Sequence, residues 1–83
     1  MEYVARTPKQ IGNALRFYRC ESGLTQAQMG EKIHLRQATV SIVESGSPGT
    51  QLVTLCDILV ALDLELLVRP RTKSSHQVFE EIF

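Results

Sequence analysis

The sequence predicts a small, mostly α-helical domain of four or five helices, followed by one β-strand. In residues 7–63, apolar side chains recur with the three- and four-residue spacing of helices, and capping signals separate the runs. Residues 64–70 instead alternate with the period of two that is typical of a strand, and a proline closes them. We therefore expect an N-terminal arm at residues 1–6, a helical domain at 7–63, a strand at 64–70 and a tail at 71–83.

The first helix is expected to begin after Thr7 and to end at Gly23. Thr7 is a capping residue, Pro8 occupies the first helical position, where its missing N–H is not needed, and Gln10 completes a capping box. Glycine supplies the left-handed conformation in which many helices end. The stripe that would face the core consists of Ile11, Ala14, Leu15 and Tyr18.

A second capping box, Thr25 with Gln28, opens a short second helix two residues later. Gly30 lies inside this helix, where glycine costs about 1 kcal/mol relative to alanine. Its presence predicts that another helix, the next one in the chain, passes too close for a side chain. Residues 34–36 then form a tight turn, with Leu35 pointing inward.

A third helix is expected at residues 37–45, with Gly46 as its stop, and a fourth after a cap at Thr50. Inner positions are Ala38, Val40 and Val43 in the third helix, and Leu52, Leu55, Ile58, Leu59 and Leu62 in the fourth. The fourth helix also has a second apolar side, formed by Val53, Cys56 and Val60. A helix that is apolar nearly all round is buried or lies in an interface. In a domain of this size we favour the interface.

The strand at residues 64–70 has no second strand in the chain to pair with. A lone strand leaves its backbone N–H and C=O groups without partners. The same strand of a second copy, paired antiparallel about a two-fold axis, is the simplest partner. We therefore expect a homodimer whose interface contains Cys56, Val60, Leu64, Leu66, Leu67 and Val68.

The two ends of the chain leave alternatives open. Tyr3 and Val4 belong to an arm without periodicity, yet they could lie against the domain. The tail is polar at first but ends with four large apolar residues, Val78, Phe79, Ile82 and Phe83. It is either a frayed or docked end, or a segment that binds a partner or signals degradation.

The charge of the chain is balanced overall but unevenly distributed. Residues 1–45 carry six basic and four acidic side chains, whereas residues 46–83 carry three basic and five acidic ones. The mildly basic first half favours a DNA-binding face of moderate strength over a general polyanion binder. No run of about 18 apolar residues and no basic leader before an apolar segment is present, which predicts neither a membrane span nor a secretory signal. We expect a cytoplasmic protein.

No catalytic or metal-binding pattern is apparent. Cys20 and Cys56 are not part of a CxxC motif or a paired histidine spacing, so we expect two buried or half-buried free thiols and no zinc site or disulfide. His34 and His76 are the only histidines, and no nucleophile accompanies them. The chain is therefore expected to be no enzyme and to need no cofactor.

The two short capped helices between Gly23 and Gly46 predict a helix-turn-helix. R-x-x-x-G-L-T-Q at residues 19–26, Q-A-T-V-S at 37–41 and E-x-G at 44–46 resemble the phage-repressor-like helix-turn-helix family, often called XRE. L-x-L-L-V-R-P directly after the fourth helix is similar to HipB-type antitoxins. That resemblance implies a repressor that dimerises partly through its C-terminal strand, binds a palindromic double-stranded DNA operator and binds a HipA-like Ser/Thr kinase toxin.

The resemblance also implies roles for single residues. Gln26 would contact a phosphate, the start of the third helix would face base edges, and Arg19 would form a structural ion pair with Glu44. The chemistry fits, since glutamine can bind adenine bidentately and alanine can contact a thymine methyl group. The expected DNA contacts are Gln26, Arg36, Gln37, Ala38, Thr39, Ser41, Ile42 and Ser47.

Ile42 departs from the family pattern, in which this position is usually polar or basic. It can offer DNA only an apolar contact. Two alternatives therefore stay open beside the antitoxin: an XRE-type regulator without a toxin partner, and a protein-interaction module that has lost base readout.

Overall fold

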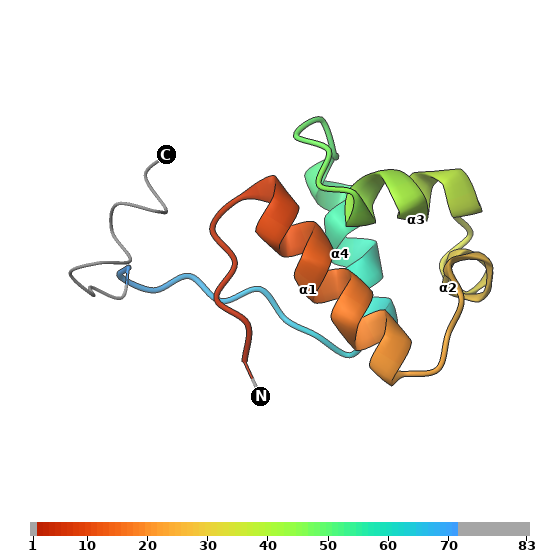
Figure 1. Cartoon of the computed structure of the whole chain (residues 1–83), viewed down its shortest axis with the longest axis horizontal. Coiled ribbons are helices and arrows are strands. Elements are labelled where there is room, and N and C mark those ends of the chain that lie inside the picture. Colours follow the sequence, from red (N-terminus) through yellow and green to blue (C-terminus); the bar gives the residue numbers. More distant parts are fainter. Residues whose placement is uncertain (1, 72–83) are drawn as a thin grey trace.

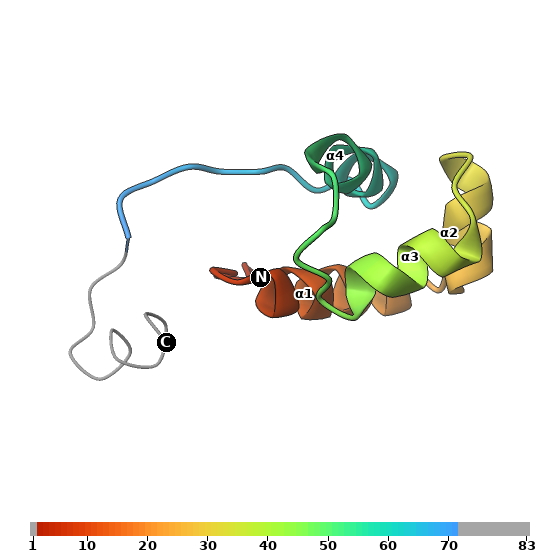
Figure 2. The same ribbon diagram turned by 90° about the horizontal axis from the view of Figure 1, so that it is seen from above.

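The computed structural model describes residues 2–71 and contains four helices within them. They are α1 (Pro8–Glu21), α2 (Gln26–Lys32), α3 (Gln37–Glu44) and α4 (Leu52–Ala61) (Figure 1). Helices α1 and α3 lie in one layer and α4 lies above them in a second, with α2 at one end (Figure 2). The prediction of a mostly α-helical domain is confirmed.

Every helix contributes to one hydrophobic core. Its most buried members are Leu15, Met29, Val40, Val43, Ile58 and Leu62. Two residues that we expected inside lie outside, because Ala38 is exposed and the side chain of Leu52 is 65% exposed. Both stand in the first turn of a helix, ahead of the point where its apolar face meets the core.

The predicted signals at the starts of α1 and α2 are largely confirmed. The Thr25 hydroxyl accepts from the Gln28 amide at 3.1 Å, and the Gln28 side chain accepts from the Thr25 amide at 2.9 Å, which is a complete capping box. Thr7 accepts from the Gln10 amide at 3.1 Å, but the Gln10 side chain accepts from the Arg6 amide instead of closing the box.

We expected Thr50 to cap α4, and this prediction was wrong. Gln51 holds that place without a side-chain hydrogen bond, and the Thr50 hydroxyl donates to the Ser47 carbonyl at 3.2 Å. The threonine thus closes the preceding loop, and the helix begins one residue later than predicted.

Each of the four helices in residues 2–71 is followed by a residue in the left-handed conformation: Gly23 after α1 (φ +75°), His34 after α2 (φ +58°), Gly46 after α3 (φ +88°) and Asp63 after α4 (φ +56°). After α1, the amides of Gly23 and Leu24 donate to the carbonyls of Cys20 and Arg19, the two bonds of a Schellman motif. The predicted role of Gly23 is confirmed.

Close packing explains two helical glycines. A Cβ built on Gly30 would lie 2.5 Å from the Leu35 carbonyl oxygen. The neighbour that excludes a side chain is therefore the turn before α3, and our expectation that α3 itself passes there was wrong. A Cβ on Gly12 would lie 2.6 Å from the Glu44 carbonyl oxygen and 2.7 Å from that of Val43, so Gly12 lets α1 approach the end of α3.

We expect Gly12→Ala to destabilise the domain by about 1–3 kcal/mol, as overpacked sites do, even though alanine improves helix propensity by about 1 kcal/mol. The added methyl group would meet backbone atoms, which cannot rotate away as a side chain could. Urea denaturation monitored by circular dichroism measures the change.

Gly49→Ala is the matched control, because its added methyl group would meet nothing nearer than the Ser47 hydroxyl at 3.9 Å. We expect the control to lie within about 0.5 kcal/mol of the parent chain. Equal stabilities for the two variants would contradict the close approach of α1 to α3.

Residues 64–71 continue from α4 as an extended segment that leaves the helical body (Figure 2). No strand pairing occurs among residues 2–71. Cys20 and Cys56 are free and both are exposed, so the expectation of buried or half-buried thiols was wrong. They lie on helix faces turned away from the core. None of the helices in the described region is long and apolar enough to cross a membrane.

Candidate nucleic-acid interface

Helix α3 has one buried and one exposed face. Val40 and Val43 are buried in the core. Gln37, Ala38, Ser41 and Ile42 are exposed, and the Ile42 side chain is 53% accessible. Their spacing of one, three and four residues places them on one side of the helix. This exposed face contains every side chain that we expected to meet base edges.

The turn before α3 adds a basic residue to the same end of the helix. Arg36 is the N-cap, it is exposed, and its side chain makes no capping hydrogen bond. The first amides of a helix lack intrahelical acceptors, and the helix dipole makes this end favourable for anions. Thr39 is half-buried one turn further along. Arg36 therefore adds a positive charge beside the exposed face of α3.

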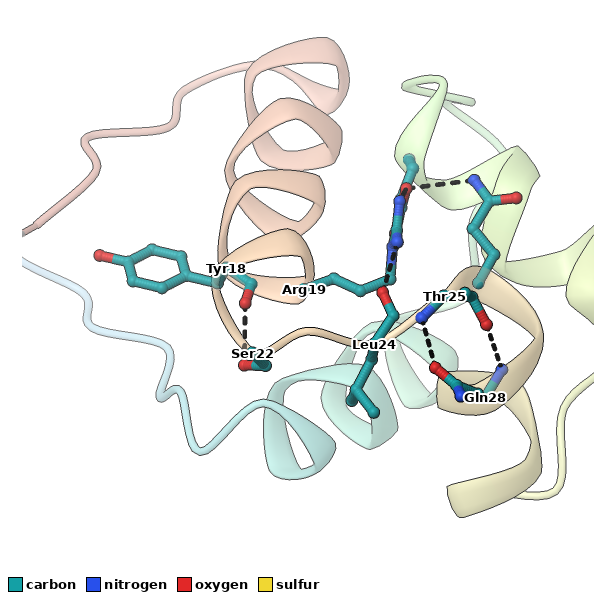
Figure 3. Close-up of polar contacts among 8 residues, drawn as sticks. Tyr18, Arg19, Ser22, Leu24, Thr25 and Gln28 are labelled. Carbon is teal, nitrogen blue, oxygen red and sulfur yellow. Dashed lines mark hydrogen bonds and ion pairs between the residues drawn. The ribbon is translucent and has the colours of Figure 1, made fainter.

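A buried ion pair ties α1 to the end of α3. Arg19 Nε lies 2.6 Å from Glu44 Oε2, and Arg19 Nη2 lies 3.0 Å from Glu44 Oε1. The remaining arm of the guanidinium donates to the Leu24 carbonyl at 2.7 Å (Figure 3). The Arg19 side chain is 10% exposed and that of Glu44 is 3% exposed. The fork-to-fork geometry is the strong form of this interaction.

The hydrogen bonds to Glu44 raise the pKa of the Arg19 guanidinium above its ordinary value, and they outweigh the opposing effect of burial. Because this pKa is raised, the contribution of the protonated guanidinium is fully present below the ordinary arginine pKa and is lost only as the pH rises through the higher, folded-state value. The positive charge of Arg19 is therefore constant under all usual conditions.

Gln26 joins this pair from the first turn of α2. Its Nε2 donates to Glu44 Oε1 at 3.2 Å, and the residue is half-buried. One amide N–H is thus directed toward the buried ion pair. We did not anticipate this hydrogen bond from the sequence, because 18 residues separate its two partners.

Ser47 is half-buried in the loop between α3 and α4, and both its amide and its hydroxyl form hydrogen bonds. Its amide donates to the Ile42 carbonyl at 3.3 Å, and its hydroxyl accepts from the Gly49 amide at 3.3 Å. The Ser47 amide is therefore paired with the end of α3, whereas the hydroxyl keeps its own hydrogen for a further acceptor.

The expected dimerisation residues lie on α4 and on the extended segment. Cys56 is exposed, and the exposed fractions are 78% for Val60, 60% for Leu66, 66% for Leu67 and 89% for Val68. Leu64 is half-buried against the core. The tail residues Val78, Phe79, Ile82 and Phe83 lie outside the described residues.

Comparison with known proteins gives this arrangement its family. A helix-turn-helix family model matches residues 15–68. Antitoxin HipB of Escherichia coli K12 is 32% identical over 75 residues, which cover 90% of this chain and 85% of that protein. The chain belongs to the HipB family. Antitoxin HipB of Escherichia coli O6:H1 is equally similar, at 32% identity over 90% of this chain and 80% of that protein.

Solved structures of HipB proteins share the fold. A chain of a HipA-HipB-O2-O3 complex aligns with a TM-score of 0.77 and 30% identity, covering 87% of this chain and all of that one. A chain of a complex between HipB and an O4 20mer aligns with a TM-score of 0.78, the same identity and the same coverage. Membership of the HipB family agrees with the expectation that the chain is not an enzyme.

Proposed function

We propose that this chain is a DNA-binding repressor and the antitoxin of a HipA-like Ser/Thr kinase toxin. The observation that carries the proposal is the match of nearly the whole described chain to HipB chains from a HipA complex and an operator complex. The exposed face of α3 supplies the chemistry that this role requires. A HipB-family repressor of this kind acts in the bacterial cytoplasm, at the nucleoid.

Helix α3 reads the operator from the major groove. Gln37 offers both a donor and an acceptor, which match N7 and the N6 amino group of adenine. Ala38 and Ile42 offer only apolar contact, which suits a thymine methyl group, and Ser41 bonds to either edge. Arg36, Thr39 and the loop at Ser47 lie against the sugar–phosphate backbone and set the register of the helix.

Gln26 binds a phosphate, and its side chain is oriented by a hydrogen bond to Glu44. The hydrogen bond from Gln26 Nε2 to Glu44 Oε1 uses one of two amide hydrogens and limits rotation of the side chain. The second N–H then remains for an anionic oxygen. Because Arg19 fixes Glu44 in turn, the ion pair connects the fold of α1 to a DNA contact on α2.

The repressor acts as a homodimer. The segment at residues 64–70 pairs with its copy as a strand, and the exposed side of α4 with Cys56 and Val60 packs beside it. Recognition helices related by such a two-fold axis lie about 34 Å apart, one turn of DNA, and bind a near-palindromic operator. The chain thus has four functional parts: the arm at residues 1–6, the domain at 7–63, the strand at 64–70 and the tail at 71–83. The tail is the segment that is left to contact the toxin.

We expect Gln37→Ala to weaken binding to the operator by about 1–3 kcal/mol without weakening binding to unrelated DNA, because it removes a base contact. Arg36→Ala should weaken binding to both DNAs alike and reduce the salt dependence by about one counterion, because it removes a phosphate contact. Fluorescence anisotropy with a duplex that the parent chain selects from a random pool measures both effects.

The two variants serve as controls for each other. If Gln37→Ala weakened operator binding and non-specific binding by the same factor, Gln37 would not read bases. If neither variant altered binding at any salt concentration, DNA would not contact the start of α3, and the assignment of this face would fail.

A further inference from the structure

An open groove of about 710 Å³ runs between the N-terminal arm and the extended segment after α4. Arm residues 2–6 form one wall and residues 63–71 form the other. The floor between them is apolar, with Ile11 and Leu15 from α1 and Leu55 and Leu59 from α4. The extended segment leaves the helical body, whereas the arm turns back beside α1 (Figure 1). The groove is as large as pockets that hold a small ligand, which span roughly 300–1,000 Å³.

The arm is held against the domain. The Tyr3 ring lies 5.4 Å from the Phe17 ring and 6.1 Å from the Tyr18 ring, measured between centroids. At the other end of the arm, the Arg6 amide donates to the side chain of Gln10. These contacts fix the arm at both ends, so the groove has a defined second wall.

Both walls of the groove have backbone N–H and C=O groups that are available for hydrogen bonding. Within residues 2–71, the backbones of residues 3–5 and 65–70 make no hydrogen bond. Large apolar side chains are also exposed here. Of the nine in the described region, five line the groove, namely Tyr3 and Val4 on the arm and Leu66, Leu67 and Val68 on the extended segment. Two bare backbone edges above an apolar floor suit an extended apolar chain, which would bind as an added strand.

We propose that residues 64–70 of a second copy occupy this groove, so that the partner's segment lies between this chain's own segment and its N-terminal arm. The inference rests on the proposed homodimer and adds the arm to its interface. Each copy then covers the other's strand on both edges. Such an arrangement is reciprocal, as a two-fold axis requires.

The charges of the segment favour a second copy over other occupants. An antiparallel pair centred on Leu67 places Glu65 opposite Arg69 of the other copy, and Leu66 opposite Val68. This register pairs each charged side chain with an opposite charge and each leucine or valine with an apolar residue. The segment is thus complementary to itself.

Sedimentation equilibrium of the full chain tests the arm. We expect Val4→Asp to raise the dimer dissociation constant at least about tenfold, because a carboxylate would lose its water in the groove. Ile42→Asp is the matched control: it places the same charge on a side chain of similar exposure, 53% against 49%, on α3. The control should change the constant less than about twofold, as surface substitutions do. Tyr3→Ala should weaken the dimer too, and circular dichroism verifies that each variant is folded.

The outcomes separate this inference from the proposed dimer. If Val4→Asp dimerised as tightly as Ile42→Asp while Leu66→Asp was monomeric, the arm would lie outside the interface and the inference would be overturned. If Leu66→Asp also dimerised normally, the proposed strand pairing itself would fail.

Cross-linking identifies the occupant. In a background with Cys20→Ser and Cys56→Ser, chains with Val4→Cys are mixed with chains with Leu67→Cys and treated with a short bifunctional maleimide. We expect a covalent heterodimer, and much less of one when Glu31→Cys replaces Val4→Cys. A dimer in solution that gives no more product with Val4→Cys than with Glu31→Cys would show that the chain's own tail or another partner fills the groove, which overturns the proposal.

Discussion

Glu44→Ala is expected to lower the free energy of unfolding by about 3–5 kcal/mol, which is the effect of removing one partner of a buried ion pair. The substitution leaves the Arg19 guanidinium buried with only the Leu24 carbonyl as an acceptor, and it removes the acceptor of Gln26. Small domains have only about 5–15 kcal/mol in total. A large fraction of the protein should therefore unfold in mild denaturant, and urea titration at neutral pH measures the loss.

Two further variants make this result specific. Glu31→Ala removes an exposed glutamate from α2 and should change stability by less than about 0.5 kcal/mol. The double variant Arg19→Met with Glu44→Leu replaces both charges with apolar groups and should be more stable than Glu44→Ala, because no charge is left unpaired. If Glu44→Ala were as stable as Glu31→Ala, the Arg19–Glu44 ion pair would not contribute to the stability of the fold.

Leu66→Asp is expected to lower operator affinity by about 10²–10⁴-fold, which is the advantage that two linked binding units have over one. The aspartate would place a carboxylate in the middle of the proposed strand pair, where Leu66 faces Val68 of the other copy. The resulting monomer would carry one recognition helix and read half of a palindrome. Anisotropy titrations with the full operator measure the loss.

A duplex containing one half-site provides the internal control. The parent chain and Leu66→Asp should bind it with the same affinity, because α3 itself is unchanged. Equal loss on half-site and full-site DNA would mean that the substitution had damaged the domain. No loss on full-site DNA would mean that dimerisation does not contribute to operator binding.

The local features of the fold could be read from the sequence because they depend on neighbours in the chain. The capping box of Thr25 and Gln28 and the left-handed Gly23 need only residues within a few positions. The exposed row on α3 follows from helical periodicity once Val40 and Val43 are recognised as core. The Arg19–Glu44 pair, though distant in sequence, came from the family resemblance.

Features that depend on distant neighbours were missed or placed wrongly. Gly30 was assigned to a helix crossing, but the Leu35 carbonyl excludes its side chain. The hydrogen bond between Gln26 and Glu44 needs α2 to stand beside the end of α3, which no local pattern records. The exposure of Cys20 and Cys56 depends on which faces of α1 and α4 turn toward the core.

The amino-acid pattern was sufficient to predict the helices, the caps at Thr7 and Thr25, the side chains that α3 exposes, and a segment at residues 64–70 that alternates like a strand. Short-range hydrogen bonding and the helical period are sufficient for these. The three-dimensional packing added that Gln26 joins the Arg19–Glu44 pair, that Gly12 lets α1 approach α3, and that the arm and the extended segment enclose one apolar groove. These features arise where chain segments far apart in sequence are packed side by side, and packing is set by the whole core and not by any one stretch.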